Sequence, residues 1–182
     1  MTDFNEMQTI KRRMYAMRNG IVADSLRKGG SPFRMIFGVN IPQLAEIADE
    51  TGKNAALAAE LYTDRSTRES MLIAPMLYPA EEMTQELAME WLRQSPAPEV
   101  TDILCHKLLR KLPFAAEIAE KCLESDNSDM MRYAGIRLLW NLLPSPTCMM
   151  RGLVVKESER NCPLTKRASQ TLIEEIDFLN ED

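Results

Sequence analysis

The chain has 182 residues, of which 45% are hydrophobic and 27% charged, with only 7 glycines and a formal net charge of −5. This is the composition of a folded globular protein, and the length suits one domain spanning residues 1–182. The negative charge excludes DNA binding through bulk charge, so a nucleic-acid partner requires a segregated basic face.

The cysteines and the N-terminus also limit the class of protein. The four cysteines form no CxxC pair and a single histidine is present, which argues against a zinc site. We expect reduced, buried thiols, no metal and no small-molecule cofactor. The first residues contain acids and no apolar core of a signal peptide, and no stretch approaches the ~20 apolar residues of a membrane span. We therefore expect a cytoplasmic protein without a membrane partner.

The first third of the chain predicts three helices. Residues 4–28 have apolar side chains, from Phe4 onward, at spacings of three and four, which predicts one long amphipathic helix ending at Gly29. Its basic residues lie off the apolar stripe: Lys11, Arg12, Arg13 and Arg18. Asn40 is a good N-cap for a second helix with Pro42 in its first turn, and residues 55–61 predict a third.

The remainder of the chain contains three copies of one sequence pattern, an apolar run with helical spacing that ends in a proline. The three copies read MLIAPMLYP, ILCHKLLRKLP and IRLLWNLLP, and their final prolines at 79, 113 and 144 are 34 and 31 residues apart. Each run is predicted to pair with the following helix: 66–78 with 83–93, 99–111 with 115–123, and 129–143 with 147–159, before a last helix at 164–179. Ser66 and Glu69 have the spacing of a capping box, and Pro75 predicts a bend.

Self-similarity at this period is typical of helical repeat proteins. Bent first helices favour HEAT-type repeats, and the tetratricopeptide signature is missing. We therefore predict an all-α, right-handed HEAT-like (ARM-type) helical repeat solenoid of about ten helices.

A motif near residue 40 adds a family resemblance. The run FGVNIPQLAEIA at residues 37–48 resembles the opening of the AlkD-like DNA alkylation repair family, whose members are helical HEAT-like repeat proteins. The order of a basic first helix, this opening and then repeats is also similar. The resemblance implies a relation to glycosylases that excise N3- or N7-alkylated purines, in which tryptophan faces and an aspartate surround a cationic lesion.

This chain differs from that family at the catalytic positions. The Trp-Asp-x-x-Asp motif falls on residues 101–105, which keeps Asp102 but replaces the tryptophan by Thr101 and the catalytic carboxylate by Cys105. A neutral thiol supplies no fixed negative charge. The second expected tryptophan falls on Thr171. The resemblance therefore implies a catalytically degenerate protein in which Asp102 is the remaining catalytic candidate.

Basic residues on successive repeats provide a candidate DNA surface. The resemblance aligns a phosphate-facing arginine with Arg132. If successive helices line one face of the protein, the basic residues of these helices would form a stripe that matches the spacing of a DNA backbone. The candidate DNA-binding residues are Lys107, Arg110, Lys111, Arg132, Lys166 and Arg167, with Arg137 nearby in the same repeat as Arg132. The other interpretation is that they are solvated charges offset by neighbouring carboxylates.

The remaining candidates are a polar pair on one predicted helix, the two tryptophans and the methionine pairs. Asp102 and His106 share a helix face at i and i+4 and can form a hydrogen bond, whereas Cys105 and His106 point about 100° apart. Trp91 and Trp140 lie among apolar residues, so we expect both in the core. Methionine pairs such as residues 130–131 and 149–150 can provide a soft protein-binding surface, although core packing is the simpler explanation.

Three functions remain open from the sequence. The first is a noncatalytic DNA- or protein-binding solenoid of the AlkD-like type, with duplex DNA or a protein as partner. The second is an active DNA glycosylase that excises N3-/N7-alkylated purines through Asp102 and one tryptophan. The third is a protein-interaction scaffold without a DNA role, which the charge of −5 favours.

Overall fold

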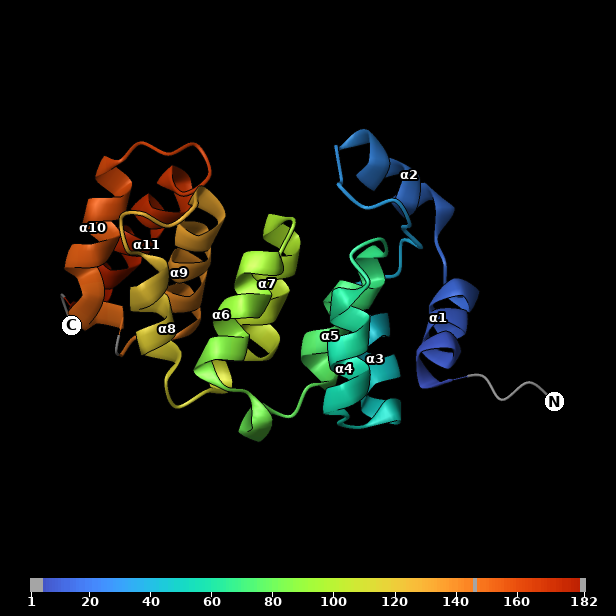
Figure 1. Cartoon of the computed structure of the whole chain (residues 1–182). Coiled ribbons are helices and arrows are strands. Elements are labelled where there is room, and N and C mark those ends of the chain that lie inside the picture. The colour runs from blue at the N-terminus through green and yellow to red at the C-terminus, as the bar shows by residue number, and fades with distance from the viewer. Residues whose placement is uncertain (1–4, 146, 181–182) are drawn as a thin grey trace. The chain divides into compact units, whose positions relative to one another are not determined.

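The computed structural model describes residues 5–145 and 147–180, and within these residues the secondary structure is helical (Figure 1). The α-helices are α1 Glu6–Ala16, α2 Gly20–Lys28, α3 Ile41–Thr51, α4 Ala55–Thr63, α5 Arg68–Leu77, α6 Gln85–Gln94, α7 Pro98–Lys107, α8 Ala115–Cys122, α9 Asp129–Asn141, α10 Arg151–Glu159 and α11 Lys166–Asn180. Met35 and Thr67 form an isolated β-bridge. The prediction of an all-α chain is confirmed.

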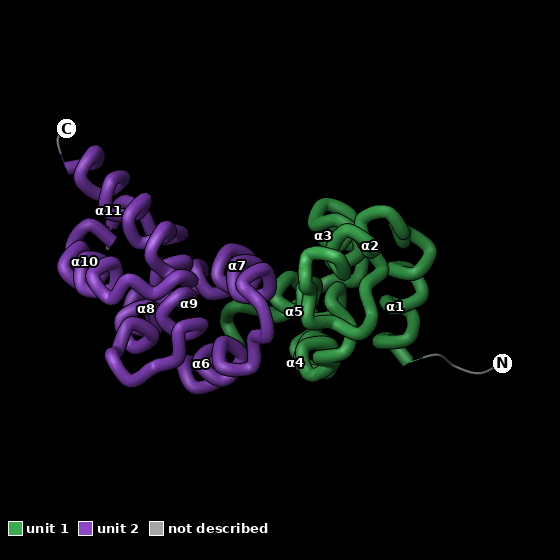
Figure 2. Tube along the Cα trace, turned by 90° about the horizontal axis from the view of Figure 1, so that it is seen from above, with its two compact units in different colours: residues 1–82 green, residues 83–182 purple. Residues whose placement is uncertain are grey.

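The chain divides into two compact units, Met1–Glu82 and Met83–Asp182 (Figure 2). Unit 1 contains α1 to α5, and unit 2 contains α6 to α11. The first predicted repeat pair therefore has its two helices in different units. The expectation of a single domain stays a prediction.

Helix α5 forms the centre of unit 1. It packs against α3 and α4, and almost all of its residues are buried, including the internal Pro75. Its apolar side chains Leu72, Ile73 and Leu77 have no exposed surface. This explains why the first proline-closed run is apolar on every face rather than along one stripe.

A buried carboxylate on α5 holds the segment that carries the family resemblance. Glu69 is fully buried, and its oxygens accept the backbone N–H of Phe37 at 3.0 Å and of Gly38 at 2.9 Å. Arg68 donates to Glu69 at 2.8 Å and to the carbonyl of Val39 at 3.2 Å. The predicted capping box of Ser66 and Glu69 is wrong, because Glu69 binds these distant N–H groups and the N-cap position of α5 is Thr67, whose side chain makes no capping hydrogen bond.

The same segment divides the predicted long first helix. Residues 4–28 form two helices, α1 and α2, and not one; Phe4 lies outside the described residues. Asn19 interrupts the helix because its side chain accepts the N–H groups of Ile21 and Val22 as an N-cap, while its own N–H donates to the carbonyl of Phe37 at 2.8 Å.

Gly38 permits this close approach. Its φ is +76°, and a Cβ atom there would lie 2.2 Å from the carbonyl oxygen of Asn19. Only glycine meets both conditions without strain. The predicted cap of the next helix is confirmed, since Asn40 and Gln43 form a complete capping box with Pro42 in the first turn.

Unit 2 is built around α9, which packs most closely on the preceding helix α8 and not, as predicted, on the following helix; α10 packs on α11. Helix α9 packs on α7 and α8 packs on α6, so like helices of successive repeats lie together. Helix α11 contacts both α9 and α10. Gly135 allows α8 and α9 to approach closely, because a Cβ atom there would lie 3.0 Å from the carbonyl oxygen of Ala119.

Two predicted helices of unit 2 have different boundaries. The helix expected at 99–111 ends at Lys107, where Leu108 leaves the helical region with φ −126°, and a 3-10 turn, Leu109–Lys111, follows. The helix expected at 147–159 begins as a 3-10 turn, Thr147–Met150, before α10. The first of these changes places Arg110 on a turn that follows α7.

Replacing Glu69 tests the buried carboxylate. Glu69→Gln removes the buried carboxylate charge that pairs with Arg68 and puts a neutral amide in its place, so we expect the free energy of unfolding to fall by about 3 kcal/mol. Urea denaturation followed by circular dichroism measures this loss. The exposed Glu46 of α3 provides the control, and equal losses in Glu69→Gln and Glu46→Gln would contradict the assignment.

Candidate nucleic-acid interface

Asp102 links α7 to α9 in unit 2. Its carboxylate accepts the Nε–H of Arg137 at 2.7 Å and the hydroxyl of Tyr133 at 3.0 Å. Burial first, and then the negative charge of Asp102, raises the pKa of Tyr133 to about 12. The phenol therefore stays protonated and donates to Asp102 at neutral pH. The terminal nitrogens of Arg137 carry further N–H groups that can donate to a phosphate.

His106 and Asn141 form a second polar link beside this one. Asn141 Nδ2 donates to the carbonyl of Arg137 at 2.7 Å, which places its Oδ1 towards His106 Nδ1 at 2.9 Å. With the amide in this orientation, Asn141 Oδ1 is the acceptor and His106 Nδ1 is the donor of this hydrogen bond. The hydrogen bond expected between Asp102 and His106 is not formed, because each side chain has a nearer partner on α9.

Two neighbouring cavities share Arg137 and Trp140. The first has a volume of about 460 Å³ and is lined by Asp102, Ile103, His106, Arg110, Arg137, Trp140 and Asn141. The second, of about 400 Å³, is lined by Arg137, Trp140, Leu164, Arg167, Ala168 and Thr171. We call these lining residues together the Trp140 surface.

The two tryptophans have different environments. Trp91 is 4% exposed and lies in the core, as expected. Trp140 is only half-buried and lines both cavities, so the expectation that it is a core residue is wrong.

The predicted basic residues lie in three environments. Arg110 and Arg167 are exposed and line the first and second cavities, one on each side of the shared Arg137. The lysines at 107, 111 and 166 belong to the lining of neither cavity. The structure therefore brings together two of the six candidates with Arg137.

Arg132 has internal partners. It is 8% exposed, and its guanidinium contacts Glu157, Asp129 and the carbonyl of Asn127. Burial acts against its charged form, but Glu157 and Asp129 outweigh that effect and raise the pKa of Arg132. The predicted contact of Arg132 with a DNA phosphate stays a prediction. Its contact with Glu157 connects α9 with α10.

The positions aligned with the family's catalytic residues are also described. Cys105 has no exposed surface, its sulfur lies 3.8 Å from the carbonyl oxygen of Ala134, and burial raises the pKa of its thiol well above the ordinary value. Thr101 is buried against Ser95, with 2.8 Å between the hydroxyls. Thr171 is exposed and lines the second cavity.

Two polar residues of α9, Tyr133 and Asn141, are not among the site residues predicted from the sequence. They lie four residues before and after Arg137 and share one face of α9 with it. That spacing is the signal that could have identified them, but Tyr133 precedes the third repeated run and Asn141 stands among its apolar residues.

Comparison with known proteins defines the class. A solved structure described as "A new family of proteins related to the HEAT-like repeat DNA glycosylases with affinity for branched DNA structures" matches 91% of this chain and 73% of its own, with a TM-score of 0.78 and 18% identity. The fold is thus an all-α, HEAT-like repeat fold, as predicted.

The family follows from the sequence match. The family model described as DNA alkylation repair enzyme matches residues 10–151, and the chain belongs to this family. No curated protein matches the chain. Among the helices of the described residues, none is long and apolar enough to cross a membrane.

The buried thiol at residue 105 leads to a labelling prediction. Because burial raises the pKa of Cys105, iodoacetamide at pH 8 should leave it unmodified in the folded protein, while the half-buried Cys148 reacts first. Peptide mass spectrometry measures both sites, with a urea-unfolded sample as control. Rapid labelling of Cys105 without unfolding would show an accessible thiolate and contradict this description.

Proposed function

We propose that this chain is a noncatalytic DNA-binding member of the DNA alkylation repair family. The observation that carries the proposal is the Trp140 surface, where Arg110, Arg137 and Arg167 gather around one half-buried indole. Arginines beside an aromatic ring are suited to phosphates and bases. Because the net charge is −5, DNA binding requires a local basic surface, and this cluster of arginines provides one.

The relatives support a DNA ligand. The family to which the chain belongs is named for DNA alkylation repair, and the solved structure with the similar fold is described as having affinity for branched DNA. Phosphate contacts contribute most of the affinity of proteins for DNA, whatever the sequence. The three arginines of the Trp140 surface are therefore proposed as phosphate contacts.

The noncatalytic part of the proposal rests on two side chains. Cys105 stands where the family resemblance expects a carboxylate, and it is a buried, protonated thiol. The carboxylate of Asp102 is engaged by Arg137 and Tyr133 and so acts as a link between helices. Neither group provides the unpaired negative charge that stabilises a cationic transition state.

A second candidate is an active alkylpurine glycosylase. It is favoured by one observation: Asp102 and Trp140 line the same cavity of about 460 Å³. A carboxylate and an aromatic face together can stabilise a cationic base. Base release distinguishes this candidate from the first.

The binding proposal predicts an arginine-dependent salt effect. Arg110→Ala combined with Arg167→Ala should weaken binding to a 20-base-pair duplex by about tenfold or more and reduce the slope of log K against log salt by about 2. Fluorescence anisotropy at several salt concentrations measures both quantities.

The control for this experiment is Lys156→Ala, which removes an exposed cation of α10 that lines neither cavity. An equal effect of the control and the double variant would reject the Trp140 surface as the binding site. If the wild-type protein does not bind duplex even at low salt, a protein partner becomes the better explanation.

The chemistry has its own prediction. Duplex DNA carrying N7-methylguanine or N3-methyladenine, incubated with the protein, should release no more free base than DNA alone. Chromatography of the released base measures this. Release above that background that disappears in Asp102→Asn would establish the glycosylase and contradict the noncatalytic proposal.

A further inference from the structure

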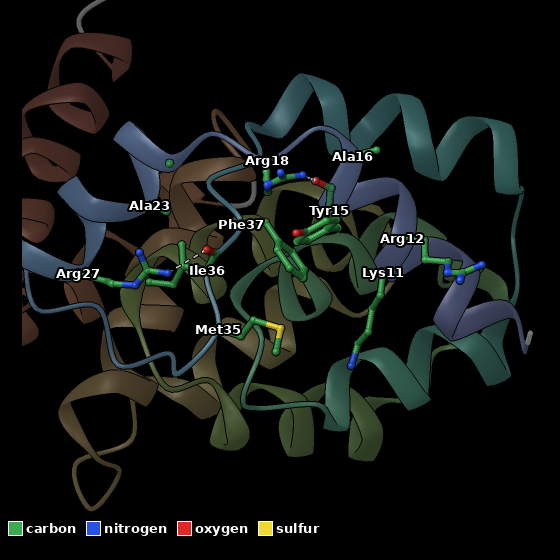
Figure 3. Close-up of a pocket in the computed structure, with 11 residues that line it drawn as sticks. Lys11, Arg12, Tyr15, Ala16, Arg18, Ala23, Arg27, Met35, Ile36 and Phe37 are labelled. Carbon is green, nitrogen blue, oxygen red and sulfur yellow. Dashed lines mark hydrogen bonds between the residues drawn. The ribbon is translucent and has the colours of Figure 1, made fainter.

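Unit 1 contains a groove that the proposed function does not use. It has a volume of about 950 Å³ and lies between α1, α2 and the extended segment 35–37. Its lining combines cations with exposed aromatic and thioether groups; the residues that carry the argument are Lys11, Arg12, Tyr15, Arg18, Arg27, Met35 and Phe37 (Figure 3).

The apolar part of the lining is exposed. Tyr15 is 55% exposed and Met35 is 44% exposed, which is high for such large hydrophobic side chains. The Tyr15 and Phe37 rings meet edge to face, with centroids 6.2 Å apart. Arg18 lies over the Tyr15 ring at 4.1 Å and donates to the Tyr15 carbonyl at 3.0 Å. The rings are thus ordered while still open to a ligand.

The backbone of the groove is fixed by hydrogen bonds to the unit 1 core. Met35 accepts the N–H of Arg68 at 3.0 Å and donates to the carbonyl of Ser66 at 2.8 Å. Phe37 is held by Glu69 on one side and by Asn19 on the other. A site formed in this way is organised before a ligand binds, which lowers the entropic cost of binding.

The cations lie on both sides of the aromatic groups. Lys11 and Arg12 are on α1, Arg27 is on α2, and in the view of Figure 3 Met35, Phe37 and Tyr15 lie between them. Among the described residues, Asp64 contacts Lys11 at 2.7 Å and Asp24 contacts Arg27 at 2.9 Å. Arg18, whose guanidinium lies over the Tyr15 ring, adds a further cation to the groove.

We infer that this groove binds an unpaired nucleotide of a DNA strand. The base would pack on Tyr15, Phe37 and Met35, and the phosphates on either side of it would meet the cations of α1 and α2. This inference rests on the proposed DNA-binding function and adds the kind of DNA: strands with unpaired bases, as at a branch point or a single-stranded end.

The chemistry favours an unpaired nucleotide over a fully paired duplex. In a duplex the faces of the bases are covered by their neighbours, so exposed aromatic groups have nothing to stack on. An unpaired base offers a free π-face, and stacking of a base on an aromatic side chain is strong and independent of sequence. An apolar groove edged by cations on two helices matches the alternation of phosphate, base and phosphate.

Two exposed groove residues provide the test, because their replacement should not affect folding. We expect Tyr15→Ala and Arg18→Ala each to weaken binding to a fluorescent 15-nucleotide oligo(dT) by about 5- to 100-fold and to change affinity for a 15-base-pair blunt duplex by less than about twofold. Fluorescence anisotropy measures both affinities, and circular dichroism verifies the fold.

Matched controls come from the same unit. Ile21→Ala and Lys28→Ala truncate an exposed apolar and an exposed basic residue of α2 outside the groove, and both should leave oligo(dT) affinity unchanged. Tyr15→Phe should retain most of the affinity, because it keeps the ring.

The outcomes separate this inference from the proposed function. If the wild-type protein binds duplex and the groove variants leave oligo(dT) affinity unchanged, the inference is wrong and the proposed function stands. If the groove variants instead abolish binding of an acidic, phenylalanine-containing peptide probe and spare oligo(dT), the groove is a peptide site and the inference is again overturned. Failure of the wild-type protein to bind either DNA would reject both.

Discussion

The geometry of unit 1 depends on one buried carboxylate. Glu69 accepts two consecutive backbone N–H groups, from Phe37 and Gly38, which are more than thirty residues away along the chain. A buried charge is tolerated only when hydrogen bonds and a partner charge compensate its desolvation, and Arg68 supplies that charge. The glycine-containing motif that carries the family resemblance is therefore a structural motif: it offers N–H groups to Glu69, and its Phe37 carbonyl accepts the N–H of Asn19, at the start of α2.

Unit 2 uses the same device at a different place. Glu157 is 1% exposed. Its carboxylate accepts the Nε–H of Arg132 and the hydroxyl of Thr165, the latter at 2.7 Å, and forms an ion pair with Arg160. These contacts hold α9 against α10 and the start of α11. Arg132 of α9 is therefore used in packing against α10, whereas Arg137 and Trp140 of the same helix line the two cavities. Each unit thus has a buried ionic anchor and a separate surface with exposed arginines and aromatic rings.

The sequence predicts the helices better than it predicts the sites. Repeated apolar runs and the cap at Asn40 are local signals, and the helices follow them. The spacing of Ser66 and Glu69 predicts a cap that does not form, because the partners of Glu69 are distant in sequence. The apolar periodicity joins α1 to α2, because the hydrogen bond from Asn19 to Phe37 exists only in the folded chain. Arg132 and Arg137 occur in the same helix, α9, yet Arg132 is buried in internal ion pairs and Arg137 lines two cavities. Burial makes this difference, and no local sequence pattern indicates it.

We propose that DNA binds two surfaces that belong to different units, with paired and unpaired strands contacting different residues. Hydrogen–deuterium exchange of the free and the DNA-bound protein, read by mass spectrometry with a branched DNA as ligand, tests this most directly. We expect slower exchange in peptides that contain residues 11–18 and 35–37 of unit 1 and residues 103–111, 137–141 and 166–171 of unit 2. Protection confined to other segments, such as α4 or α10, would contradict it.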